Sequence, residues 1–314
     1  MHYLGTIALV VTVAIGAATA NAGLVAGGIP NASDPDLQLW LDADDLGTLT
    51  FGTGSGVLGW ADKSTYGRDF QSSSTTDPGW VHSANHEPTS GLNQLNSRNV
   101  LYFGENDFLQ TSVANALPSS ARTMFFVYRP YATGFKTVLN SHDQPTGTGL
   151  WYAVADMEGE ADGTWFQAGN GTWPAVFFSS DEGPAGHTVG SPRLASIAMD
   201  PTNPVDGTTL RADGHVLTNE SGSACPGITV SQAVNPLTIG DFWDNIGNGN
   251  FNGDVAEILI YDRALDWEEF NAVGYYLQTK WDISGTYTPD PGTLLIISLG
   301  GGVFLRRKRA AWKH

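Results

Sequence analysis

Aspartates in short polar turns are the residues of this sequence best suited to metal chemistry. Asp42 and Asp44 share one acidic turn. Asp241 follows a glycine, and Asp254 lies between a glycine and a valine. Carboxylate oxygens are hard ligands of the kind that Ca²⁺ prefers, so these four residues are candidate ligands of a structural calcium ion. One alternative is that they cap turns or line a solvated face. Another is that Asp42 and Asp254 are framework residues hydrogen-bonded to buried backbone.

Tryptophans in glycine- and asparagine-rich stretches indicate a second kind of site. An indole ring offers a large flat face that can stack on the CH groups of a sugar, while nearby carboxylates bond its hydroxyls. The candidate ligand-binding residues of this kind are Trp165, Trp173, Trp243 and Asp244. An equally good interpretation is that these rings pin long loops onto the body of the protein.

One acidic segment, Asp156–Asp162, has the spacing of a catalytic strand. If it were extended, Glu158, Glu160 and Asp162 would share one face. Retaining glycoside hydrolysis needs two carboxyl groups about 5–5.5 Å apart. However, Gly159 and the lack of β-branched residues favour a loop. The sequence also contains no metalloprotease histidine pair, nucleophile elbow or phosphate-binding loop, so we expect a protein that is not an enzyme.

The overall charge narrows the classes of partner. The 314 residues include 15 basic and 32 acidic side chains, a formal net charge of −17. A surface of this sign repels nucleic acid, so we expect no nucleic-acid partner. The single cysteine, Cys225, excludes an intramolecular disulfide framework. Stability must therefore come from the size of the core and from any bound metal ion.

The elements that must position these residues are short strands. Apolar runs rich in β-branched and aromatic residues are bounded by Gly, Pro, Asn or Asp, in a chain with 38 glycines and 16 prolines. The predicted strands are Leu37–Asp42, Asn99–Phe103, Thr123–Tyr128, Trp151–Val154, Leu194–Met199, Leu237–Ile239 and Val255–Tyr261. This pattern predicts an all-β, antiparallel sandwich.

Helical spacing of apolar residues stands out between Trp267 and Trp281. Asp266 is the predicted N-cap, and Glu269 completes a capping box. Gly274 inside the helix costs about 1 kcal/mol relative to alanine, so we expect something to pack closely against it. This amphipathic helix is expected to cover one edge or end of the sandwich.

Three blocks of the sequence resemble the bacterial laminin-G-like domain: Leu39–Asp45, Trp60–Ser64, and Phe251–Leu265 with its continuation to Trp281. That family belongs to the concanavalin A-like lectin/glucanase jelly rolls. The resemblance implies a jelly-roll sandwich of two curved antiparallel sheets, and a function in binding or adhesion. Many relatives hold a structural Ca²⁺. Three tryptophans of these blocks are expected in the core: Trp40, Trp60 and Trp281.

The N-terminal residues 1–22 have the pattern of a secretory signal peptide. An apolar run, Ile7–Ala20, is followed by the small-x-small sequence Ala20-Asn21-Ala22. The alternative is a membrane anchor, but the run is shorter than the roughly 20 residues that span a bilayer. We expect cleavage before Gly23.

The C-terminal residues 289–314 resemble the PEP-CTERM sorting signal of Gram-negative bacteria. In order, they contain Pro289, Asp290, Pro291 and Gly292, the apolar run Thr293–Leu305, and the basic residues Arg306, Arg307, Lys308 and Arg309. The resemblance implies recognition by a membrane protease, exosortase; Asp290 stands where the family usually has glutamate. As a helix the run is about 20 Å long, short of a bilayer core of about 30 Å. A plain membrane anchor is the alternative.

Removal of both ends leaves residues 23–288 as one domain with ten basic and 31 acidic side chains. We expect an exported binding module of the cell envelope, outer surface or extracellular matrix of a Gram-negative-type bacterium. Its expected partners are a polysaccharide or surface protein, an exosortase-like protease, and transiently the membrane. The alternatives are a structural matrix protein without a ligand and a glycan-cleaving enzyme of the glucanase type.

Overall fold

The computed structural model describes residues 24–25, 29–52, 54–72, 88–104, 107–114, 122–132, 136–141, 148–155, 163–170, 175–179, 189–200, 202–203, 207–219, 225, 236–241 and 250–288. The predicted signal peptide and sorting segment lie outside these residues, as does the acidic segment Asp156–Asp162. The division of the chain into three parts therefore remains a prediction.

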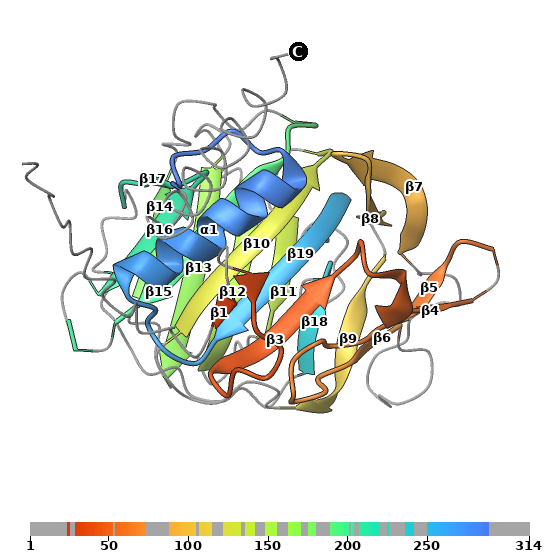
Figure 1. Ribbon diagram of the computed structural model, residues 1–314, viewed down its shortest axis with the longest axis horizontal. Coiled ribbons are helices and arrows are strands. Elements are labelled where there is room, and N and C mark those ends of the chain that lie inside the picture. Colours follow the sequence, from red (N-terminus) through yellow and green to blue (C-terminus); the bar gives the residue numbers. More distant parts are fainter. Residues whose placement is uncertain are drawn as a thin grey trace, which may run out of the picture.

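Two antiparallel sheets face each other (Figure 1). The first sheet has the order β17-β16-β15-β10-β19-β8-β7, with β3 paired to the same edge of β19 as β8. Its strands are β3 (Leu37–Asp42), β7 (Thr89–Leu95), β8 (Arg98–Phe103), β10 (Arg122–Pro130), β15 (Arg193–Met199), β16 (Thr208–Ala212), β17 (His215–Val216) and β19 (Gly253–Tyr261).

The second sheet has the order β14-β13-β12-β11-β18-β9-β6-β5-β4. Its strands are β4 (Leu49–Phe51), β5 (Val57–Trp60), β6 (Phe70–Gln71), β9 (Leu109–Ala114), β11 (Lys136–Asn140), β12 (Thr148–Ala155), β13 (Gly163–Asn170), β14 (Ala175–Ser179) and β18 (Pro236–Ile239). A 3₁₀ helix, η1 (Leu46–Thr48), precedes β4, and β1 (Leu24–Val25) pairs with β2 (Ile29–Pro30).

The apolar core has two layers, because the first sheet is covered on both faces. In β10, Met124 and Phe126 face the second sheet, whereas Phe125 and Val127 face the opposite side. This double burial explains why β10 is a continuous apolar run rather than an alternating one. Leu259 of β19 also faces the outer layer, so the central pair of strands supports both cores.

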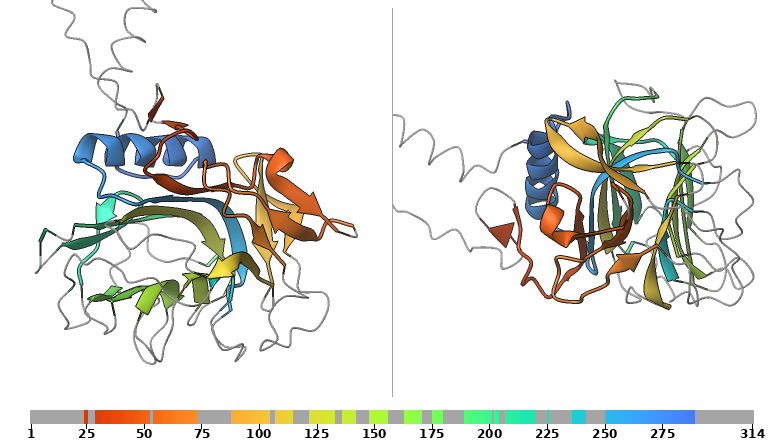
Figure 2. Two further views of the ribbon diagram at one scale, coloured as in Figure 1. Left: turned by 90° about the horizontal axis from the view of Figure 1, so that it is seen from below. Right: turned by 90° about the vertical axis from the view of Figure 1, so that its right-hand side faces the viewer.

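The outer layer is closed by the helix α1 (Trp267–Trp281), which Figure 2 shows on the face of the first sheet opposite the second sheet. Asp266 and Glu269 form the capping box that the sequence predicts. Phe270 packs against Phe125, with ring centroids 5.0 Å apart. A Cβ atom added at Gly274 would overlap the ring of Tyr287, which is the close packing expected there.

Within the described residues the fold confirms the predicted class, an all-β antiparallel sandwich with one α-helix after the last strand. Each of the seven predicted strands forms, and Trp40, Trp60 and Trp281 are buried, with 7%, 0% and 1% of their surface exposed. The helix bounds agree with the prediction. In the described part of the chain, no helix is both long and apolar enough to cross a bilayer.

Candidate functional site

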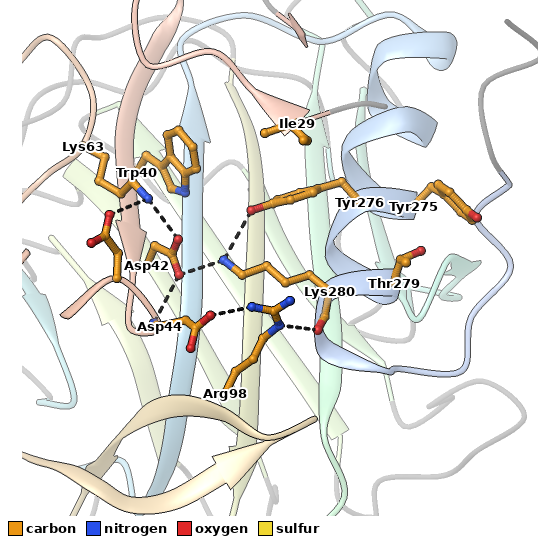
Figure 3. A pocket seen from close by; sticks show the side chains of 11 residues that line it. Ile29, Trp40, Asp42, Asp44, Lys63, Arg98, Tyr275, Tyr276, Thr279 and Lys280 are labelled. Carbon is orange, nitrogen blue, oxygen red and sulfur yellow. Dashed lines mark hydrogen bonds and ion pairs between the residues drawn. The ribbon is translucent and has the colours of Figure 1, made fainter. Parts of the chain in front are cut away.

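An open pocket of about 690 Å³ lies beside the C-terminal half of α1 (Figure 3). We call it the α1 pocket. The strand β3 and the turn after it supply Trp40, Asp42, Asp44 and Asp45, the loop after β5 supplies Lys63, β8 supplies Arg98, and α1 supplies Tyr275, Tyr276, Thr279 and Lys280. The pocket therefore joins segments that are far apart in the sequence.

The base of the pocket rests on a buried carboxylate, Glu257 of β19. Its side chain has 0% exposure because β19 is covered on both faces. It accepts hydrogen bonds from the indole nitrogens of Trp40 at 2.9 Å and Trp281 at 2.8 Å. The Nζ of Lys280 and the hydroxyl of Tyr276 donate to it at 2.8 and 3.1 Å. Burial raises the pKa of Glu257, and the charge of Lys280 opposes that shift.

Negative and positive side chains alternate from Glu257, at the bottom of the pocket, to the rim. Lys280 also donates to Asp42 at 2.7 Å, and Asp42 in turn pairs with Lys63 at 3.0 Å. Lys63 reaches Asp45 at 2.9 Å and lies 4.3 Å from the centroid of the Trp40 ring. Burial alone would lower the pKa of Lys63, but the hydrogen bond to Asp45 and the charge of Asp42 raise it. Such an alternating network holds each side chain in one position.

The rim offers polar groups of both kinds. Arg98 donates to the Oδ2 of Asp44 at 2.6 Å and, from Nε, to the carbonyl oxygen of Lys280 at 3.0 Å. Their side chains remain partly open to solvent, 41% for Arg98 and 24% for Asp44. Thr279 is exposed beside them. The pocket thus presents fixed donors, fixed acceptors and a hydroxyl to a ligand.

The structure does not gather the four predicted calcium ligands. Asp42 and Asp44 lie at the α1 pocket with lysine and arginine partners. Asp254 is fully buried elsewhere in the first sheet and pairs with Arg129. Asp241 is buried after β18. Within the described residues, no three or more His, Cys, Asp or Glu side chains are grouped so as to hold a metal ion. A bound calcium ion remains a prediction.

Asp254 acts as a framework residue. It accepts hydrogen bonds from the Nδ2 of Asn93 at 2.8 Å, the hydroxyl of Tyr131 at 2.6 Å, and the Nε of Arg129 at 2.8 Å. These donors are side chains, whereas the alternative interpretation of the sequence expected buried backbone. The effect is to tie β7 and the end of β10 to the start of β19.

The structure describes only part of the predicted aromatic site. Trp165 belongs to β13, but its side chain is not among the described ones. Trp173, Trp243 and Asp244 lie outside the described residues altogether. This site therefore also stays a prediction.

Sequence reasoning missed Lys63, Arg98, Glu257 and Lys280 as site residues. Three of them, all except Arg98, fall within the blocks that carry the laminin-G-like resemblance. A charged residue inside an otherwise apolar block is a signal of a buried ion pair. That signal was present, but it does not say which partner each charge takes.

Comparison with known proteins does not assign the chain to a family. No family model matches the sequence, and no curated protein matches it. Solved structures that resemble it include domain 4 of AbnA, a GH43 extracellular arabinanase from Geobacillus stearothermophilus in complex with arabinotriose. That match has 12% identity and a TM-score of 0.45, and it covers 76% of this chain and 98% of the other.

Two other solved structures are similarly distant from this chain in sequence. The binding domain of Paraclostridial Mosquitocidal Protein 1 shows 13% identity and a TM-score of 0.49, covering 76% and 51% of the two chains. The CBM40 of a Ruminococcus gnavus IT-sialidase, bound to alpha2,6 sialyllactose, shows 15% identity and a TM-score of 0.37, covering 50% and 84%. At these scores nothing about a ligand follows from the matches. Fold and site define an antiparallel β-sandwich with a charged pocket beside its one described α-helix.

Proposed function

We propose that this protein is an exported polysaccharide-binding module of the cell surface or extracellular matrix, and that the α1 pocket receives the saccharide. The observation that carries the proposal is the pocket itself. Its volume of about 690 Å³ lies within the range of small-molecule sites, roughly 300–1,000 Å³. Its lining of fixed donors and acceptors matches a hydroxyl-rich ligand.

Preorganisation supports binding at this place. The side chains of Asp42, Lys63 and Lys280 are held by ion pairs on two sides. A ligand therefore meets groups whose conformational entropy has already been lost, which favours affinity. The partly exposed Arg98 and Asp44 are the groups best placed to exchange solvent hydrogen bonds for ligand hydroxyls.

The same arrangement favours binding over catalysis. A glycosidase acid must combine a raised pKa with access to the scissile bond. Burial raises the pKa of Glu257, but its side chain has no exposed surface. The more accessible Asp44 and Asp45 are each paired with a cationic side chain. We therefore propose that the protein does not cleave its ligand.

A glycan array tests the proposal with the full chain, with and without calcium. Two variants make a matched pair. Thr279→Trp fills the pocket from an exposed position on α1, and Thr50→Trp adds the same bulk at an exposed position of β4. We expect binding by the wild type and by Thr50→Trp, and loss of binding by Thr279→Trp. Equal binding by both variants would place the saccharide elsewhere, with the predicted aromatic site of Trp165, Trp173 and Trp243 as the next candidate.

The second candidate is a structural matrix protein without a ligand. The observation in its favour is that most charges of the pocket pair with one another and brace α1 against β3 and β19. A folded chain that binds no glycan on the array, and whose melting temperature no glycan changes, would favour this candidate. Chelation by EDTA in the same melting experiment tests the predicted calcium ion.

A further inference from the structure

An exposed apolar patch lies at the other end of α1. Trp267, the first residue of the helix, is 62% exposed, and Val216 of the edge strand β17 is 59% exposed. Between them lies Arg211 of β16, whose guanidinium carbon is 5.5 Å from the centroid of the Trp267 ring. We call Trp267, Arg211 and Val216 the Trp267 patch.

The three side chains share one side of the first sheet. Leu210 and Ala212 of β16 point into the core between the sheets, so Arg211 points the other way, toward α1. Arg211 and Val216 are directly paired across β16 and β17, and cross-strand partners lie on the same face. Trp267 is held in place by stacking on Phe270, with ring centroids 6.4 Å apart.

The described chain ends beside this patch. After α1 the backbone turns back along the helix toward its N-terminal half (Figure 1). The Nδ2 of Asn271 donates to the carbonyl oxygen of Thr288 at 2.7 Å, and the Thr288 amide donates to the Oδ1 of Asn271 at 3.1 Å. Thr286 is hydrogen-bonded to Asp213, in the turn that joins β16 and β17. Asn271 lies one helical turn from Trp267, a rise of about 6 Å.

The short segment after Thr288 limits how far from the Trp267 patch the apolar run of the tail can begin. Only residues 289–292 separate Thr288 from Thr293, where that run starts. Thr288 and Thr293 are thus five residue steps apart, which span at most about 18 Å when extended. Any bilayer that receives the apolar run Thr293–Leu305 must therefore lie close to the Trp267 patch.

We propose that the Trp267 patch is a membrane-contact surface, which touches the lipid headgroup region while the C-terminal tail is inserted. This inference rests on the export that we propose above and on the tail insertion that the sequence predicts. Tryptophan is favoured at the membrane interface, because its ring is apolar and its N–H is polar. Arg211 adds a cation suited to lipid phosphates, and Val216 adds apolar area. The membrane thus orients the domain, with the N-terminal end of α1 toward the lipid.

Fluorescence quenching of the full chain in phosphatidylcholine vesicles tests this contact. A polarity-sensitive dye is attached to Val216→Cys, and the vesicles carry a lipid spin-labelled at its headgroup. Leu92→Cys is the matched control, since Leu92 is 63% exposed on β7, the edge strand opposite β17. The wild type, treated with the same dye, measures the fluorescence that comes from labelling of the buried Cys225. We expect about threefold stronger quenching at position 216, because six strand spacings of about 4.8 Å separate the two edges.

The outcomes separate this inference from the proposal on which it rests. Co-flotation of the chain with vesicles, but equal or no quenching at both positions, would overturn the contact and leave tail insertion standing. A chain that does not co-float would overturn both. Loss of the extra quenching in a Trp267→Ser variant that melts like the wild type would support the contact. If a polysaccharide shields the dye at position 216 from solvent in the absence of vesicles, the patch is a saccharide site. That result would overturn the proposed membrane contact.

Discussion

Lys280, in the last turn of α1, donates a hydrogen bond of 2.8 Å to Glu257, a carboxylate of β19 with no exposed side-chain surface. The pair joins the helix to the centre of the first sheet. It also fixes the base of the α1 pocket, since Trp40, Trp281 and Tyr276 donate to the same carboxylate. Fold stability and site geometry therefore depend on the same two residues.

Removal of Lys280 should cost much more stability than removal of Lys63. Lys280→Met leaves Glu257 buried without its cation, and breaking a buried pair in this way costs about 3–5 kcal/mol. Lys63→Met changes the same charge, but its partner Asp45 is 43% exposed and its buried partner Asp42 keeps the ion pair with Lys280, so we expect about 1 kcal/mol or less. Urea unfolding measures both free energies. Equal losses would show that the Glu257 pair is not the anchor of α1.

Gly274→Ala should destabilise the protein, although alanine is the better helix-forming residue. Alanine is favoured over glycine inside a helix by about 1 kcal/mol. Here the added methyl group would overlap the Tyr287 ring, and overpacking of this kind costs about 1–3 kcal/mol. In a Tyr287→Ala background the same change should become stabilising. If the effect of Gly274→Ala has the same sign in both backgrounds, Tyr287 is not the cause.

The pair of Asp45 and Lys63 should make stability depend on pH. The hydrogen bond from Lys63 lowers the pKa of Asp45 below its ordinary value of 3.8. A carboxyl group with a lower pKa in the folded state stabilises the fold above its unfolded pKa, and this contribution is lost as the pH falls through the folded value. Urea midpoints from about pH 5 to about pH 2.5 should fall more steeply for the wild type than for Asp45→Asn. Parallel curves would contradict this linkage.

Cleavage of the tail is a prediction about the exported form. If Pro289–Gly292 is a recognition motif, the mature protein ends near Pro289 and loses five of its 15 basic side chains. A membrane anchor would instead keep the whole C-terminus. Intact-mass analysis of the exported protein separates the two forms. A mature form that still ends in His314 would rule out processing.

The sequence predicts those parts of the fold whose signal is local. β10 is a continuous apolar run and α1 has a capping box and helical spacing, so both follow from neighbouring residues. β7 (Thr89–Leu95) is mostly polar and contains Gly91 in a left-handed conformation, so its strand depends on pairing with β8. That pairing is not visible in a short window of sequence.

The α1 pocket could not be predicted for a similar reason. Asp42 and Lys280 are in contact across 238 residues of sequence. The aspartates of the turn after β3 look like metal ligands when they are considered alone. Their lysine and arginine partners come from other elements, and only the fold brings those partners to them.

Calorimetric titration of the strongest glycan from the array tests the central claim most directly. Arg98→Ala removes a partly exposed donor from the rim of the α1 pocket, and Arg211→Ala removes an arginine from the opposite end of α1. We predict about tenfold weaker binding for Arg98→Ala, equivalent to about 1.4 kcal/mol, and wild-type affinity for Arg211→Ala. Wild-type affinity for Arg98→Ala, or weakening by Arg211→Ala alone, would contradict saccharide binding at the α1 pocket.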